Sequence, residues 1–177
     1  MRRLEIGSGN RPLPGYEHLD IDPKCPEVDY VSSMEIVPVE DNAFDEIVSI
    51  HSIEHISWRS GAKALKEWHR VLKPDGRLYV ATPNLRWIAQ MYLENAPSGW
   101  GQDFAVLHPD EKAHLKVNGS YMHTLWANFK IFSSTAGGDN HYACYDAVLL
   151  TELLKQAGFK KLRVLEDGAA LVMEAFK

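Results

Sequence analysis

The sequence predicts an α/β domain whose sheet is mostly parallel and ends in an antiparallel hairpin. Short apolar runs alternate with amphipathic segments along the 177-residue chain, a pattern typical of strand–helix units around a parallel sheet. Near the C-terminus, residues 162–166 and 169–176 instead read as two strands. Asp167-Gly168 separates them and favours a two-residue turn, because both positions tolerate a positive φ.

The remaining elements follow from apolar periodicity and from the residues that interrupt it. Strands are expected at residues 3–6, 16–20, 29–31, 44–50 and 77–82, and helices at 60–73, 84–95 and 146–157. The turn at 74–76 ends the first helix, and Gly158 ends the last one. The expected inward-facing residues are Ala62, Leu65, Trp68 and Leu72 in the first helix and Val148, Leu149, Leu153 and Leu154 in the last.

Composition indicates one globular domain spanning residues 1–177, with 45% apolar and 24% charged residues. The net charge of −5 argues against nucleic acid as the main partner, because phosphate binding needs a basic face. Cys25 and Cys144 form neither a metal motif nor a disulfide framework, so a cytoplasmic location is expected. No apolar run is long enough to span a bilayer, and the first strand begins too early for a signal peptide.

Two glycines and an acid form the most informative pattern. The first strand runs into Gly7-Ser8-Gly9, and the second ends at Asp20. Glycine has no Cβ, so a ligand can lie directly on the backbone, and a carboxylate at a neighbouring strand end can accept hydrogen bonds from a ribose diol. Asp22 is the competing acid. The pattern predicts a nucleoside-containing cofactor, and the short connection leaves no room for a full crossover helix.

This order of motifs resembles the class I S-adenosylmethionine-dependent methyltransferases, most closely the small type 11 group. The resemblance covers nearly the whole chain and is carried by residues 4–9, 20, 33–45, 50–56, 67–78 and 153–159. It implies a Rossmann-like seven-stranded sheet in the order 3-2-1-4-5-7-6, with reduced helices after the first and second strands. It also implies S-adenosyl-L-methionine as the cofactor and an insertion at residues 84–142 that covers it like a lid.

The resemblance also assigns roles to individual residues. Glu5 would reach the ammonium group of the methyl donor, Asp20 its ribose and Met34 its adenine. Ser33 stands where the family often has an acid beside the adenine amine. The full set of expected cofactor-binding residues is Glu5, Gly7, Ser8, Gly9, Asp20, Ile21, Ser33, Met34 and His51.

The expected reaction is methyl transfer to a small-molecule or saccharide-like acceptor, with oxygen favoured over nitrogen or carbon. The sulfonium donor is already activated, so the protein mainly needs to align donor and acceptor. A hydroxyl acceptor must also lose a proton, for which a histidine is suited. The candidate catalytic residues are His51, His141 and Tyr142.

Three alternatives stay open. Ser33 and the shortened first crossover would suit a methyltransferase-like protein that binds without turnover. An NAD-dependent oxidoreductase would require a parallel final strand. His51-Ser52-Ile53-Glu54-His55 matches the H-x-x-E-H pattern of a group of zinc peptidases. His51 lies at a strand exit and no third ligand is fixed by spacing, so no metal is expected.

Overall fold

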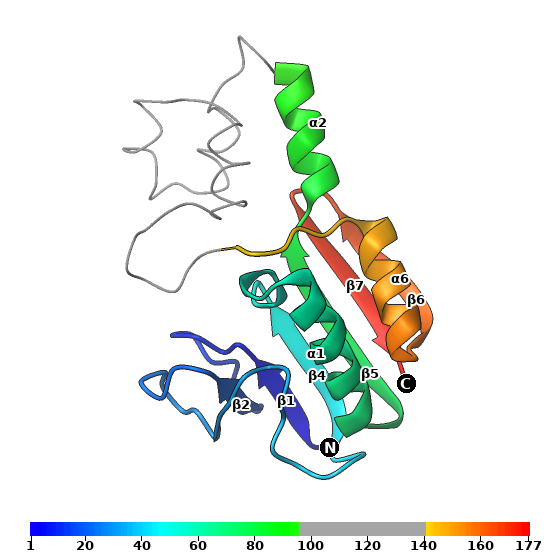
Figure 1. The fold of residues 1–177 in the computed structure, drawn as a ribbon. Helices are drawn as coiled ribbons and strands as arrows, with labels where there is room; N and C mark the ends of the chain where they lie inside the picture. The colour runs from blue at the N-terminus through cyan, green and yellow to red at the C-terminus, as the bar shows by residue number, and fades with distance from the viewer. Residues whose placement is uncertain (96–140) are drawn as a thin grey trace.

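The computed structural model describes residues 1–95 and 141–177 (Figure 1). Seven strands form one sheet in the order β3-β2-β1-β4-β5-β7-β6, which confirms the expected topology. The strands are β1 (Arg3–Ile6), β2 (Glu17–Asp20), β3 (Tyr30–Val31), β4 (Phe44–Ile50), β5 (Leu72–Pro83), β6 (Lys160–Asp167) and β7 (Ala170–Phe176). The helices are the 3-10 turn η1 (Ile53–His55), α1 (Trp58–Val71), α2 (Leu85–Asn95) and α6 (Ala147–Ala157).

The first five strands pair in parallel, whereas β7 runs antiparallel to both β5 and β6. This arrangement confirms the mixed sheet. It also lacks the parallel final strand that an NAD-type sheet would require.

The hairpin turn differs from the expectation. Strand β6 ends at Asp167 and β7 begins at Ala170, so Gly168 and Ala169 connect the strands, and neither Asp167 nor Gly168 has a positive φ. The prediction of a two-residue turn at Asp167-Gly168 was therefore wrong. The β6–β7 ladder contains two register irregularities, which shift the pairing from the one that a tight turn would impose.

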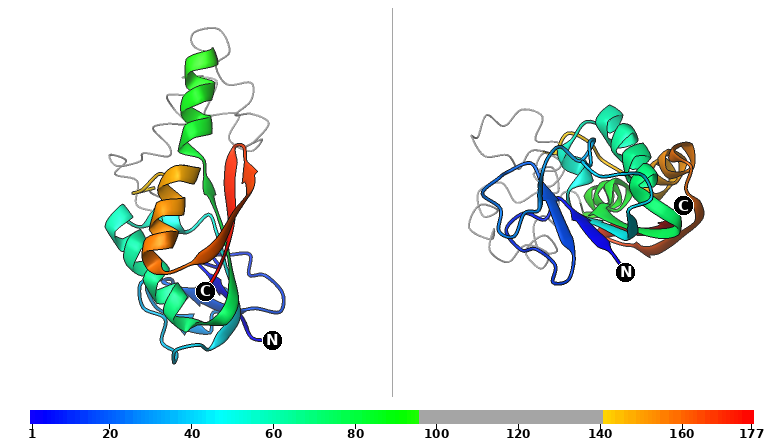
Figure 2. Two further views of the ribbon diagram at one scale, coloured as in Figure 1. Left: turned by 90° about the vertical axis from the view of Figure 1, so that its right-hand side faces the viewer. Right: turned by 90° about the horizontal axis from the view of Figure 1, so that it is seen from below.

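Helices α1 and α6 cover one face of the sheet (Figures 1 and 2). The Ser57 and Asp146 side chains cap their N-termini, and Gly158, with a φ of 105°, ends α6 as expected. The largest fully buried side chains are Trp68, Tyr145, Phe44, Leu4, Ile6, Leu19, Ile47, Ile53, Leu65, Leu72, Leu78 and Leu150. None of the helices in the described ranges is long and apolar enough to cross a membrane.

The inward faces of the two helices were predicted only in part. In α1, Leu65 and Trp68 are buried as expected, and Ala62 is half-buried. In α6, Leu153 and Leu154 are buried, but Val148 and Leu149 are exposed and Leu150 takes the inward position. A run of consecutive apolar residues at a helix start leaves the phase of its apolar face undetermined, which explains this error.

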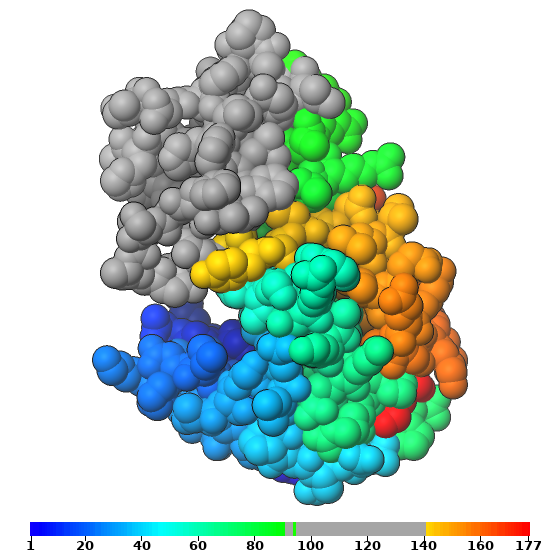
Figure 3. All heavy atoms as spheres, in the orientation of Figure 1, coloured from blue at the N-terminus to red at the C-terminus, as the bar shows by residue number. Residues whose placement is uncertain are grey.

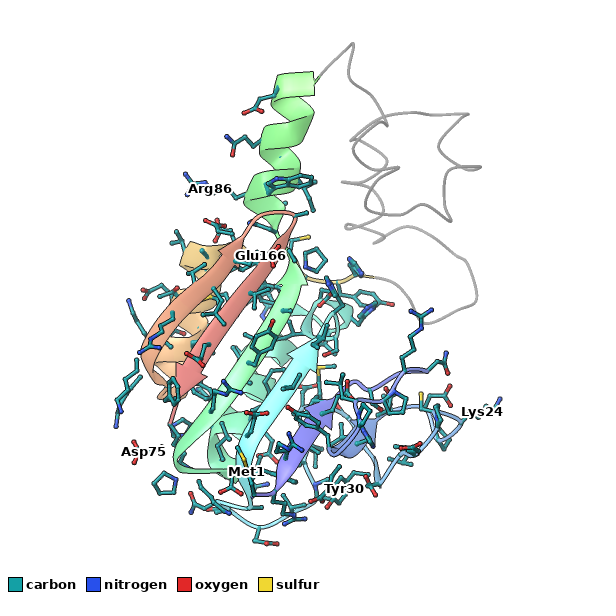
Figure 4. All side chains as sticks on the ribbon, turned by 180° about the vertical axis from the view of Figure 1, so that it is seen from behind. Met1, Lys24, Tyr30, Asp75, Arg86 and Glu166 are labelled. Carbon is teal, nitrogen blue, oxygen red and sulfur yellow. The ribbon has the colours of Figure 1, made fainter. Side chains whose placement is uncertain are left out.

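The opposite face of the sheet carries no helix among the described residues (Figure 4). An ion-pair network lies there instead, between the buried carboxylates Glu46 and Glu174 and the partly exposed Arg77. Arg77 donates to Glu46 through Nε at 2.9 Å and to Glu174 through Nη1 at 3.3 Å. Tyr16 also donates its hydroxyl to Glu46. This bond ties the connection between β1 and β2 to the centre of the sheet.

Candidate active site

Most of the predicted cofactor residues lie at the carboxyl ends of β1, β2 and β4, whereas Ser33 and Met34 follow β3. Strand β1 lies between β2 and β4 and pairs in parallel with both, so the loops that follow these strands emerge at one edge of the sheet. In open α/β sheets this edge is where ligands bind.

The two glycines of the loop both have a left-handed backbone, but their surroundings differ. Gly7 has a φ of 74°, and a Cβ built on it would lie 2.4 Å from Ser52 Cβ. Gly9 has a φ of 55°, and a Cβ there would meet no atom of residues 1–95 and 141–177 within 4 Å. Gly7 therefore packs the loop against the segment after β4, whereas Gly9 faces open space.

Asp20 is held by backbone donors on both sides. Its Oδ2 accepts from the Gly9 N–H at 2.9 Å, and its Oδ1 accepts from the Asp22 N–H at 2.9 Å. A carboxylate has about four acceptor sites, so these two bonds orient Asp20 and leave acceptor capacity for a ligand. Asp22 instead accepts from the Lys24 N–H.

Glu5 and Ser8 line the inner side of the same loop. Glu5 is buried, and its Oε2 accepts from the Leu13 N–H at 2.7 Å. Burial raises the pKa of Glu5 above its ordinary value. The Ser8 hydroxyl is also buried, and it has no hydrogen-bond partner among the described residues. Glu5 thus holds the loop closed, while Ser8 offers an unsatisfied polar atom.

The segment expected beside the adenine is fixed by α1. The Trp68 Nε1–H donates to the Met34 carbonyl at 2.9 Å, and Met34 packs against the core. The Ser33 hydroxyl accepts from the Glu35 N–H at 3.3 Å. Ile21, which follows β2, is 74% exposed. These contacts place Ser33 and Met34 firmly, whereas the Ile21 side chain lies at the surface.

His51 leaves β4 in a strained conformation. Its φ is 48°, in the left-handed region that non-glycine residues rarely adopt. Its N–H donates to the Ala81 carbonyl, and its half-exposed ring places Nδ1 3.3 Å from Glu54 Oε1. The nearby Glu54 carboxylate raises the pKa of His51 above its ordinary value, although burial acts in the opposite direction.

Glu54 connects all three candidate catalytic residues. Its backbone carbonyl accepts from the Tyr142 N–H at 2.8 Å and from the Ala143 N–H at 3.2 Å. In Figure 3 the yellow segment before α6 lies directly against the residues after β4. The His141 ring consequently meets the His55 ring edge-on, with centroids 4.7 Å apart. Tyr142 itself is about half exposed.

Glu54 and His55 were not among the expected site residues. Their sequence signals were the H-x-x-E-H pattern and their place in the segment 50–56 that carries the family resemblance, and neither indicates that a distant segment returns to them. Most of the lid-like insertion at 84–142 lies outside the described residues, so its covering role stays a prediction.

Comparisons with known proteins agree with this architecture. Residues 17–80 match a protein-family model that is described as a methyltransferase domain. An uncharacterised Escherichia coli protein, YafE, is 48% identical over 46 residues, which make up 26% of this chain and 21% of that protein. The match thus spans about a fifth of the curated relative.

Solved structures match over nearly the whole chain. A Thermotoga maritima protein described as a possible histamine N-methyltransferase superposes with a TM-score of 0.64, at 19% identity over 99% of this chain and 82% of its own. The fold is that of the class I methyltransferases. A Burkholderia thailandensis 1,6-didemethyltoxoflavin-N1-methyltransferase, crystallised with S-adenosylhomocysteine, gives a TM-score of 0.57 at 14% identity, covering 99% of this chain and 70% of its own. These matches confirm the resemblance to class I methyltransferases that the order of motifs indicates.

Proposed function

We propose that this protein binds S-adenosyl-L-methionine and transfers its methyl group to a hydroxyl of a small-molecule or saccharide-like acceptor. The observation that carries the proposal is the pairing of Asp20 with the open side of Gly9. The Gly9 N–H donates to the Asp20 carboxylate at 2.9 Å, and no atom of the described residues would contact a Cβ on Gly9. A nucleoside can therefore approach the backbone and the carboxylate together.

Two further features fit a methyl donor. The buried Ser8 hydroxyl has no hydrogen-bond partner among the described residues, and a polar ligand group in the loop would satisfy it. The β1–β2 connection contains no helix. A helix N-terminus is a favourable site for phosphates, so its absence suits a cofactor without a pyrophosphate better than a dinucleotide.

The chemistry that the donor supplies when bound is an activated methyl group, whose carbon–sulfur bond breaks as the new carbon–oxygen bond forms. The task of the chain is then to hold donor and acceptor in line and to exclude water. Asp20, Gly9 and Met34 would fix the nucleoside. His51 and Tyr142 lie beside Glu54 at the next strand end, where an acceptor hydroxyl would meet the methyl group.

The proposal of a hydroxyl acceptor is supported by the histidines near the end of β4, because a histidine is suited to accept the hydroxyl proton. The two similar structures named above carry the names of nitrogen methyltransferases, a possible histamine N-methyltransferase and a 1,6-didemethyltoxoflavin-N1-methyltransferase. An acceptor panel should therefore include both amines and hydroxyl compounds. We expect turnover with hydroxyl acceptors, and methylation of amines alone would overturn the oxygen preference.

The cofactor assignment is tested by calorimetric titration with S-adenosylhomocysteine. We expect Asp20→Asn to weaken binding by about 10- to 100-fold, because hydrogen bonds to a charged group contribute about 1.5–3 kcal/mol. Asp22→Asn is the matched control, an acid two residues away, and should change affinity less than about threefold.

The outcomes separate the competing functions. An equal loss of S-adenosylhomocysteine affinity in both variants would contradict the role of Asp20. Failure of S-adenosylhomocysteine to bind to the unsubstituted protein would contradict the proposed methyltransferase activity. Binding without turnover on any acceptor of the panel would favour the alternative of a methyltransferase fold that only binds.

A further inference from the structure

The described residues contain one cluster of metal-ligating side chains that the methyl-donor site does not use. Glu54, His55 and His141 each offer one ligand atom, and the three atoms lie within 4.8 Å of one another. Glu54 and His55 belong to η1, whereas His141 arrives on the segment before α6. The three groups are one carboxylate and two imidazoles.

The backbone brings these groups together. The Glu54 carbonyl accepts two hydrogen bonds, from the N–H groups of Tyr142 and Ala143. The Leu85 N–H donates to the Tyr145 carbonyl at 2.9 Å, which fixes the same segment to the start of α2. His141 is therefore positioned beside η1 by backbone contacts of its neighbours.

Two polar atoms of the cluster are buried and lack hydrogen bonds. Glu54 is 1% exposed; its Oε2 accepts from the Thr82 hydroxyl at 3.2 Å, but its Oε1 has no hydrogen-bond partner in the described part of the chain. His55 Nδ1 is likewise buried without a partner. A buried polar atom that forms no hydrogen bond costs about 1–3 kcal/mol, and more when it is charged.

His51 satisfies this cluster only in part. Its Nδ1 approaches Glu54 Oε1 at 3.3 Å from the solvent side, and its side chain is 52% exposed. This contact provides partial charge compensation for the carboxylate. It provides no partner for His55 Nδ1. A single cation bound between Glu54 and the two histidines would satisfy both buried atoms.

We propose that Glu54, His55 and His141 bind a divalent first-row transition metal ion of the zinc class. Two imidazoles with one carboxylate form a common ligand set for Zn²⁺, whereas Mg²⁺ and Ca²⁺ prefer oxygen ligands. Bonds of about 2.0–2.2 Å place the ligand atoms of a tetrahedral site roughly 3.5 Å apart. Side-chain movements of about 1 Å therefore close the site. Three protein ligands leave a coordination position open.

The open position suggests a role that rests on the proposed function. The cluster lies at the same strand ends as the cofactor residues, next to His51. An acceptor hydroxyl that binds the ion would be oriented toward the methyl donor, and coordination would ease loss of its proton to solvent. His141 then acts as a metal ligand rather than as the proton acceptor that the sequence suggested.

The test is calorimetric titration of the full chain with Zn²⁺ after treatment with a chelator. We expect one equivalent to bind, and His141→Ala to weaken binding at least tenfold. His141 lies outside every helix and strand, so this variant should fold, as circular dichroism can check. Co²⁺ provides an independent readout, since imidazole and carboxylate ligation gives visible d–d absorption that His141→Ala should reduce.

Matched controls separate ligation from general effects. His69→Gln alters a histidine that packs against Phe159 instead, and Glu166→Gln alters an exposed carboxylate on β6. Both should leave the Zn²⁺ affinity within about twofold of the unsubstituted protein, whereas Glu54→Gln should lower it at least tenfold. Absence of Zn²⁺ binding, or an unchanged affinity in His141→Ala, would overturn the proposal.

Titration of the same preparation with S-adenosylhomocysteine keeps the two proposals apart. Binding of the nucleoside without Zn²⁺ would overturn the metal site and leave the proposed function intact. Binding of Zn²⁺ without the nucleoside would support the metal site and contradict the methyltransferase.

Discussion

Gly7 and Gly9 share a left-handed backbone, but their surroundings differ. Gly7 has a φ of 74° and touches the segment after β4, whereas Gly9 has a φ of 55° and no neighbour at its Cβ position within the described part of the chain. Both positions favour glycine, because a Cβ strains this conformation. Among the described residues, a Cβ would also clash at Gly7 but not at Gly9. Glycine at position 7 is therefore required by the fold, whereas we propose that glycine at position 9 is required by a ligand.

Alanine substitutions should reveal this difference. Gly7→Ala should destabilise the protein by roughly 3 kcal/mol, because the strain adds to a clash with Ser52. Gly9→Ala should cost about 1–2 kcal/mol but should weaken S-adenosylhomocysteine binding more than tenfold. Chemical denaturation and calorimetry would measure the two effects. Equal destabilisation with unchanged affinity in Gly9→Ala would contradict the account.

Site residues that belong to a local sequence pattern were easier to predict than site residues that only the fold brings together. Asp20 and the glycine loop follow from strand ends that can be read locally. The contact between Glu54 and the Tyr142 N–H joins distant parts of the chain, and no local pattern encodes it. The left-handed φ of His51 was likewise not predictable, because only a few per cent of non-glycine residues adopt that region, although histidine is enriched among them.

At the scale of elements, α1 acts as the support for the segment that would contact adenine. Glu67 Oε1 accepts from the Val37 N–H at 2.8 Å, and Arg70 donates to the carbonyls of Val37 and Val39. Arg70 also pairs with Glu67 at 2.8 Å. One face of the helix thus binds the backbone that follows Met34.

This network predicts a pH-dependent contribution to stability. Arg70 lowers the pKa of Glu67 below its ordinary value, against the opposing effect of burial. A lowered folded-state pKa gives stability that is present above the unfolded value, about 4.3, and is lost as the pH falls through the folded value. Glu67→Gln should therefore destabilise the protein by about 1–2 kcal/mol at pH 7.

Urea denaturation at several pH values would measure this effect. The difference between Glu67→Gln and the unsubstituted protein should shrink below about pH 4.3, where the carboxyl group becomes protonated. Glu152→Gln is the matched control, because Glu152 forms an exposed pair with Lys155 in α6. A difference independent of pH would show that the charge of Glu67 does not contribute.

The whole molecule has helices α1 and α6 on one face of its sheet and an ion-pair network on the other (Figures 2 and 4). Motif order predicted the strand order, because the resemblance covers nearly the whole chain. The residues of α6 that face the core and the position of the hairpin turn were predicted wrongly. Both depend on how elements pack against the finished sheet, which local periodicity does not determine.

Cofactor binding should stabilise the whole domain. A ligand at 100 times its dissociation constant adds about 2.7 kcal/mol, which for a chain of this size raises Tm by roughly 5–10 °C. S-adenosylhomocysteine should give this shift in a thermal melt, and NAD at the same concentration should give none. A shift with NAD alone would revive the oxidoreductase alternative.

A crystal structure with S-adenosylhomocysteine would show where the nucleoside binds. We expect both ribose hydroxyls within hydrogen-bond distance of the Asp20 carboxylate, with the nucleoside lying on the Gly9 backbone. A nucleoside bound away from the ends of β1 and β2 would contradict this expectation.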